Sequence, residues 1–168
     1  MKRLMLTLII AVCGLSAYAQ SNTHHLMIGG GMLYERGVDV TLAWENETRH
    51  HNAWEYFANG YVKWQVCPTC GYVCKDSFWH NYRTWLIGAA YKPCVWRGRN
   101  FHGNLRLGAS AGSNTDAVIA GLHVGYEQHW ALPHGWAIYC QAKCDVILPN
   151  RLDLFREGIC IGVKLPNF

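Results

Sequence analysis

The sequence predicts an all-β protein, an eight-stranded antiparallel up-and-down β-barrel of the outer-membrane type, and three observations carry this prediction. From residue 25 onward, apolar and polar side chains alternate in stretches of about ten residues, which is the period of a strand. We count eight such stretches, and eight strands make the smallest closed outer-membrane barrel. Charged residues make up only 15% of the chain and aromatic residues 13%, which argues against a charge-coated soluble enzyme.

The start of the chain has the pattern of a cleavable secretory signal peptide. Lys2 and Arg3 precede an apolar run over residues 4–15, and Ala17 and Ala19 supply the small residues before the cleavage position. We expect residues 1–19 to be removed during export through the Sec pathway, and residues 20–168 to form a single barrel domain. Because removal lowers the formal charge from +4 to about +2, no direct nucleic-acid binding is expected.

The predicted strands are bounded by Gly, Asn, Pro or Asp, and no 3.6-residue apolar stripe competes with the alternation. In the second stretch Val40 and Leu42 share one face, while Asp39 and Glu45 share the other. The eight predicted strands span residues 25–35, 37–46, 53–66, 82–92, 102–112, 117–129, 136–147 and 156–165.

The later strands repeat this division into an apolar and a polar face. In the third stretch the aromatic Phe57 and Tyr61 are exceptions, because they fall on the polar side. The sixth stretch places Leu122 and Val124 opposite His123, and the seventh and eighth alternate in the same way.

Alternation alone does not say which face points outward, because a soluble lipocalin-like barrel turns its apolar face inward. Side-chain size favours a membrane barrel, since the narrow interior of eight strands suits small and charged residues while lipid suits large apolar ones. The apolar faces carry Trp44, Trp54, Trp64, Trp85 and Trp136, and the polar faces carry Gly88, Gly108, Gly121, Gly125, Gly158 and Gly162. Tryptophan near strand ends also matches the aromatic belts at membrane interfaces.

The same phase predicts a salt-bridged polar network inside the barrel, with five acidic and five basic residues. Unpaired buried charge is costly, so a balanced set in a narrow lumen indicates a structural plug rather than a conducting channel. The predicted interior residues are Asp39, Glu45, Glu55, Glu127, Asp145, Lys63, Lys92, Arg106, Lys143 and Lys164.

The longest predicted connection, residues 66–81, is expected to face outside the cell if the N-terminus lies in the periplasm. We predict that it is a partner-contact loop, because clustered cysteines precede an aromatic tip. The residues concerned are Cys67, Cys70, Cys74, Phe78, Trp79 and His80. Exported cysteines favour a disulfide, whereas Cys67 and Cys70 also resemble a zinc knuckle that lacks its second half. Both readings stay open, and we assign no metal and no cofactor.

An enzyme would need a nucleophile, a base and an orienting group. His123 and Glu127 share one polar face, and Ser110 or Ser113 supplies a hydroxyl, but no spacing among them is specific. We therefore predict no catalytic residues. A lipid-modifying membrane enzyme and a soluble periplasmic barrel that binds an apolar ligand remain as alternatives.

Four segments resemble the TraO-type proteins of conjugative transposons. They are SFWHNYRTW at 77–85, AYKPC at 90–94, NLRLGASAG at 104–112 and DLFREGICIGVK at 153–164. The resemblance implies a small exported envelope protein, non-enzymatic, that works with a conjugative transfer apparatus. We accordingly expect a barrel in the bacterial outer membrane that contacts lipid and other envelope or conjugation subunits through its loops.

Overall fold

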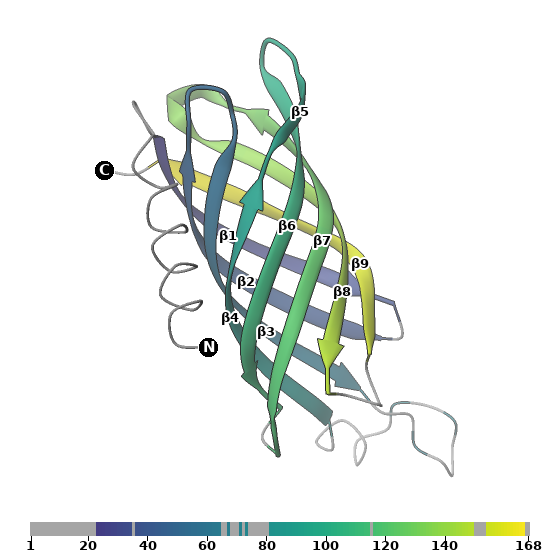
Figure 1. The fold of residues 1–168 in the computed structure, drawn as a ribbon. Coiled ribbons are helices and arrows are strands. Elements are labelled where there is room, and N and C mark those ends of the chain that lie inside the picture. Colours follow the sequence, from purple (N-terminus) through teal and green to yellow (C-terminus); the bar gives the residue numbers. More distant parts are fainter. Residues whose placement is uncertain are drawn as a thin grey trace, which may run out of the picture.

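Nine tilted strands form one antiparallel sheet that closes on itself in the computed structural model (Figure 1). The structure describes residues 23–34, 36–64, 67, 71, 73, 81–114, 116–149 and 154–166, and the expected signal peptide lies outside these ranges. The elements are β1 (Thr23–Leu33), β2 (Gly37–Glu47), β3 (Ala53–Trp64), β4 (Asn81–Lys92), β5 (Cys94–Arg97), β6 (Phe101–Ser113), β7 (Val118–Ala131), the 3-10 turn η2 (Pro133–Gly135), β8 (Ala137–Leu148) and β9 (Phe155–Pro166). Among the described residues, no helix is long and apolar enough to span a membrane.

The nine strands occupy eight positions around the barrel, because β5 continues β4 beyond Pro93. Proline has no N–H to donate, but the Pro93 carbonyl accepts a hydrogen bond of 3.0 Å from the Leu105 amide. Both β4 and β5 pair with β6, and β1 pairs with β9 from His25 to Leu33, which closes the barrel. The predicted eight-stranded antiparallel barrel is confirmed. The fourth strand ends at Lys92 as predicted, but the sequence did not indicate that pairing resumes at Cys94 in β5.

The two ends of the barrel differ in their connections. The terminal end, at the top of Figure 1, is where β1 begins and β9 finishes, and it carries the connections 48–52, 98–100 and 132–136. The loop end carries the connections 34–36, 65–80, 114–117 and 149–154. The β5–β6 hairpin rises above the rest of the terminal end (Figure 1).

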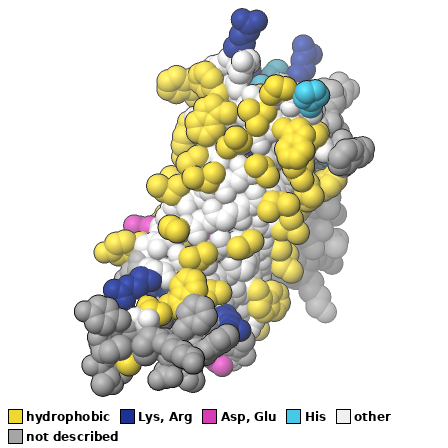
Figure 2. All heavy atoms as spheres, turned by 180° about the vertical axis from the view of Figure 1, so that it is seen from behind, with side chains coloured by type: hydrophobic (Ala, Val, Ile, Leu, Met, Phe, Trp, Pro, Cys, Tyr) yellow, Lys and Arg dark blue, Asp and Glu magenta, His cyan; other side chains and the backbone are white. Residues whose placement is uncertain are grey.

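The apolar face of the strands points outward. Val40, Leu42, Ile87 and Leu122 are all at least 50% exposed, whereas Asp39 and Glu45 on the alternate positions are at most 1% exposed. Figure 2 shows hydrophobic side chains over the barrel wall, with Lys, Arg, Asp, Glu and His gathered toward the two ends. A lipocalin-like barrel requires the opposite arrangement, so this orientation speaks against an apolar ligand cavity inside.

Aromatic side chains ring the outside of the terminal end. Trp54 and Tyr91 sit side by side on β3 and β4, with ring centroids 5.1 Å apart. The outward aromatic residues at this end are Trp44, Trp54, Tyr91, Trp96, Phe101, Trp130 and Trp136. At the loop end, Tyr34, Trp85 and Phe155 are exposed in the same way.

Large inward side chains lie over glycines of neighbouring strands. A Cβ added at Gly29 or Gly162 would collide with the ring of Tyr139, so these glycines make room for that ring. Phe57 and Tyr61, the exceptions to the sequence pattern, both point inward and are buried. Guanidinium groups cover their faces, with Arg106 4.4 Å from the Phe57 centroid and Arg156 4.0 Å from that of Tyr61.

Candidate functional site

A buried group of ion pairs lies across the barrel toward its terminal end, and we call it the charged core. Lys92, from the end of β4, has its Nζ 2.5 Å from Glu45, 2.5 Å from Glu55 and 2.8 Å from Glu127. Glu45 and Glu55 face each other directly in the register of β2 and β3. Because the Lys92 side chain is fully buried, the three carboxylates replace all of its lost hydration.

Two further cations complete the charged core. Lys164 on β9 lies 2.6 Å from Glu45 and 2.8 Å from Glu127. Arg106 on β6 donates to Glu55 from Nε at 3.0 Å and from Nη2 at 2.7 Å. Three carboxylates therefore meet three cations, and the core is neutral with each group hydrogen-bonded. These ion pairs connect side chains of β2, β3, β4, β6, β7 and β9. Each charged group of the core has a partner of opposite charge.

A second polar chain runs from the charged core toward the loop end. Lys143 pairs with Asp39 and lies 3.4 Å from Asp145. Asn59 donates to Asp39 at 2.9 Å and to the Thr41 hydroxyl at 2.8 Å. These contacts join β2, β3 and β8 across the lumen.

Ser110, His123 and Asp145 form a hydrogen-bonded line of the kind seen in serine hydrolases. Ser110 Oγ lies 2.7 Å from His123 Nε2, and His123 Nδ1 lies 2.7 Å from Asp145 Oδ1. His123 and Glu127 share the inward face of β7 as predicted, but Glu127 pairs with Lys92 and Lys164 rather than with His123. Ser113, the other hydroxyl considered, donates to the Ala117 carbonyl in the β6–β7 connection.

The described residues around this line are closely packed. Ser110, His123 and Asp145 are each at most 9% exposed, and the His123 ring packs edge-on against Phe57. The adjoining internal cavity has a volume of about 10 Å³, which is close to the space of a single water molecule. Its hydrogen bonds connect β6, β7 and β8 across the lumen, and we call this line the polar strut.

The structure places nine of the ten predicted interior residues inside the barrel, buried: Asp39, Glu45, Glu55, Lys92, Arg106, Glu127, Lys143, Asp145 and Lys164. Lys63 differs, because it lies near the loop end of β3 and is only partly buried. Arg156 was missed, although its inward position follows the alternation of β9; it donates to the Thr84 hydroxyl at 3.0 Å. Of the predicted contact loop, Cys67 is partly exposed. Cys70, Cys74, Phe78, Trp79 and His80 lie outside the described residues.

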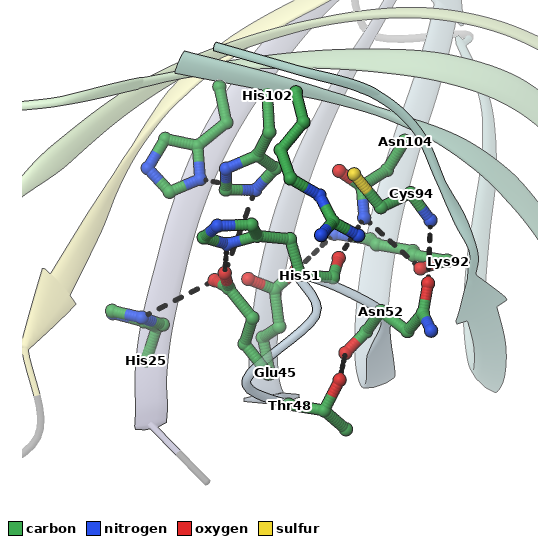
Figure 3. Close-up of polar contacts among 12 residues, drawn as sticks. His25, Glu45, Thr48, His51, Asn52, Lys92, Cys94, His102 and Asn104 are labelled. Carbon is green, nitrogen blue, oxygen red and sulfur yellow. Dashed lines mark hydrogen bonds and ion pairs between the residues drawn. The ribbon is translucent and has the colours of Figure 1, made fainter. Parts of the chain in front are cut away.

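The sequence interpretation also missed a group at the terminal end, which we call the histidine cluster: His25, His51, His102, His129 and Glu47. Figure 3 shows His25, His51 and His102 converging at the mouth of the barrel. Ligand atoms of Glu47, His102 and His129 all lie within 4.8 Å of one another, as do those of Glu45, Glu55 and Glu127 in the charged core. The doublets His24-His25 and His50-His51 were the available sequence signal.

Comparison with models of known protein families and with curated proteins finds no match. A solved structure described as "De novo design of transmembrane beta-barrels" matches with a TM-score of 0.51 and 10% sequence identity. The match covers 88% of this chain and 98% of the designed one. This chain is therefore similar in fold to a designed transmembrane barrel, and no family membership follows.

Proposed function

We propose that this protein is a β-barrel that spans a bacterial outer membrane and serves there as a non-enzymatic anchor. The observation that carries the proposal is the distribution of side chains, with ion pairs inside and a largely apolar, almost uncharged surface along the middle of the strands. In water such a surface would be a large exposed patch, whereas a bilayer covers it. Apart from the short β5, each strand has 11 to 14 residues, which is enough for the roughly 9 to 11 that a tilted membrane crossing needs.

The few outward charges support the same orientation. Leaving β5 aside, Arg83 and Glu157 are the only outward-facing residues with a full charge among the described strand positions. Both lie near the loop end, beyond the central part of the wall. The belt of aromatic side chains around the terminal end matches one interfacial belt of a membrane barrel, and the exposed Tyr34, Trp85 and Phe155 of the loop end match the other.

Membrane fractionation with a heat-modifiability gel tests the proposal directly. We expect extraction from the membrane only by detergent, and a mobility difference between boiled and unboiled samples. Release as a soluble protein without such a shift would refute the membrane assignment.

A pair of matched substitutions tests the depth of the wall in lipid. Val124 and Val118 lie on the same outward face of β7, one near its middle and one at its first residue. Val124→Arg should lower the unfolding free energy in lipid vesicles by about 2–4 kcal/mol and Val118→Arg by about 1 kcal/mol or less. Equal effects would contradict a bilayer around the middle of the wall.

Within the membrane, we propose that the barrel holds surface loops for contact with other subunits of a conjugative transfer apparatus. The resemblance of the segments at 77–85 and 153–164 to TraO-type proteins supports this role, and the filled lumen favours an anchor over a pore. Replacing residues 66–80 by a short Gly-Ser linker should lower the transfer frequency of a donor cell while the heat-modifiable barrel persists. Unchanged transfer would argue against the loop as the contact surface.

The hydrogen-bonded line of Ser110, His123 and Asp145 favours a second candidate, a lipid-modifying enzyme, and its enclosure weighs against it. A fluorophosphonate probe distinguishes the two. We expect no labelling of the folded protein, and labelling that disappears in Ser110→Ala would establish the enzyme instead.

A further inference from the structure

The histidine cluster stands at the terminal end of the barrel, where polar side chains are open to water from one side. Of the nine histidines of the chain, His24, His25, His50, His51, His102, His129 and His134 lie at this end. His123 lies deeper in the lumen, and His80 falls outside the described residues. Solvation of a polar face does not by itself account for this concentration of imidazole side chains.

Glu47 is the centre of the cluster. It is the last residue of β2, is 5% exposed, and all of its ion-pair partners among the described residues are histidines. Its Oε1 lies 2.5 Å from His51 Nδ1 and 3.8 Å from His102 Nε2, and its Oε2 lies 3.7 Å from His25 Nε2. Within the described ranges, no lysine or arginine is paired with this buried carboxylate, in contrast to the carboxylates of the charged core.

Two imidazoles meet each other beside this carboxylate. His102 on β6 and His129 on β7 face each other in the strand register, and His129 Nδ1 lies 2.9 Å from His102 Nε2. Only one proton fits between these two nitrogens, so one of them presents a lone pair. Both side chains are nearly buried, at 6% and 5% exposed, which fixes their positions.

The spacing of these atoms suits a transition metal. Bonds of about 2.0–2.1 Å in a tetrahedral zinc site place ligand atoms about 3.3 Å apart. The separations of 3.8 Å from Glu47 to His102 and 2.9 Å from His102 to His129 bracket that value. Imidazole and carboxylate ligands select zinc and its neighbours in the first transition row, whereas calcium and magnesium prefer sets made of oxygen.

The β2–β3 turn places His51 beside the carboxylate of Glu47. His51 has a positive φ of 62°, and its amide donates to the Thr48 carbonyl at 2.9 Å. The Thr48 hydroxyl donates to the Asn52 carbonyl, and Asn104 donates to the His51 carbonyl at 2.6 Å (Figure 3). The turn thus fixes the His51 ring against Glu47 and stacks it on His102 with centroids 4.4 Å apart.

We propose that Glu47, His102 and His129 bind a divalent transition-metal ion of the zinc class, with water completing the coordination and His51 holding the Glu47 carboxylate in place. His25 lies next to the carboxylate and orients it. The ion would compensate the negative charge of Glu47 and would link β2, β6 and β7 at the terminal end of the barrel. This site does not depend on the membrane assignment or on any role in conjugation.

The test uses the full exported protein, folded in detergent micelles, stripped with EDTA and treated with N-ethylmaleimide, because free cysteine thiolates would compete for zinc. Isothermal titration with Zn²⁺ should give one ion per chain, and the melting temperature should rise with zinc. The substitutions His102→Ala and Glu47→Gln should each weaken binding by at least about tenfold. His134→Ala, which alters a histidine of the η2 turn at the same end, should bind like the unaltered protein.

Cobalt provides a second readout that does not depend on affinity. Co²⁺ in the site should show visible absorption typical of nitrogen and oxygen ligands, and this absorption should be lost in His102→Ala. If His102→Ala does not fold, as judged by heat modifiability, Glu47→Gln and the partly exposed His51→Ala replace it. Absence of stoichiometric binding, or equal binding by the cluster variants and His134→Ala, would overturn the proposal.

Discussion

The charged core and the histidine cluster contain similar sets of converging ligand atoms and differ in what surrounds them. In each, three atoms from His or Glu lie within 4.8 Å of one another. In the charged core, Lys92, Lys164 and Arg106 compensate the three carboxylates directly. In the histidine cluster, Glu47 has only imidazole partners among the described residues. The comparison teaches that convergence alone does not make a metal site, because resident cations can satisfy the same carboxylates.

Removing a cation from the charged core should have the largest effect. Lys92→Ala leaves three carboxylates with two cations, and an uncompensated buried charge costs about 3–5 kcal/mol. The unfolding free energy in micelles, followed by tryptophan fluorescence in urea, measures this loss. Lys63→Ala, at a partly buried lysine near the loop end, is the control and should cost less than about 1 kcal/mol. Equal losses would mean that the charged core does not stabilise the barrel.

Matched carboxylate-to-amide substitutions sharpen the comparison. Glu127→Gln removes the charge that binds Lys92 and Lys164, so we expect a loss of about 1.5–3 kcal/mol with or without zinc. Glu47→Gln should cost about 1 kcal/mol or less in the absence of metal, but should abolish the rise in melting temperature caused by zinc. A zinc response that survives in Glu47→Gln and vanishes in Glu127→Gln would reverse the two assignments.

Ser110→Ala tests the polar strut and should have a smaller effect. The substitution removes one hydrogen bond to His123 and leaves the bond from His123 to Asp145 in place. We expect a change of about 0.5–1.5 kcal/mol in the unfolding free energy. A loss above about 3 kcal/mol would show that the line of three residues stabilises the barrel as much as the charged core does.

Salt should have the smallest effect. Surface ion pairs weaken when the ionic strength rises, whereas buried pairs are screened much less. The Lys92, Lys164, Glu45 and Glu127 side chains are at most 1% exposed. Raising NaCl from 0.1 to 1 M should therefore change the urea-unfolding free energy by less than about 1 kcal/mol. A steep decline would mean that water and ions enter the lumen.

The parts of the structure that depend on alternation were accessible from the sequence. Whether Asp39 or Val40 points inward is decided by a period of two within one strand, so the polar interior could be predicted residue by residue. The aromatic Phe57 and Tyr61 also followed the phase, although their types suggested the other face; Arg106 and Arg156 cover their rings. Local pattern was sufficient because each of these residues answers to its own strand.

Contacts between distant strands could not be predicted in this way. Glu47 and His129 are 82 positions apart, and their approach depends on the register of every strand between them and on closure of the sheet. The same holds for Ser110 and Asp145, whose alignment with His123 needs the pairings of β6, β7 and β8 together. The β5 extension was missed for a different reason, since proline commonly ends a strand, but here the Pro93 carbonyl still accepts a hydrogen bond and pairing resumes at Cys94.

The position of Lys164 on β9 makes the order of assembly matter. Glu45 and Glu127 lie on strands that are synthesised earlier, yet each depends on an ammonium group from the strand that closes the barrel against β1. A chain that stops before β9 leaves both an open sheet edge and an excess of negative charge in the lumen. The electrostatic cost of the buried carboxylates is therefore relieved only when β9 is in register. Closure of the barrel and pairing of its buried charges are coupled in this way.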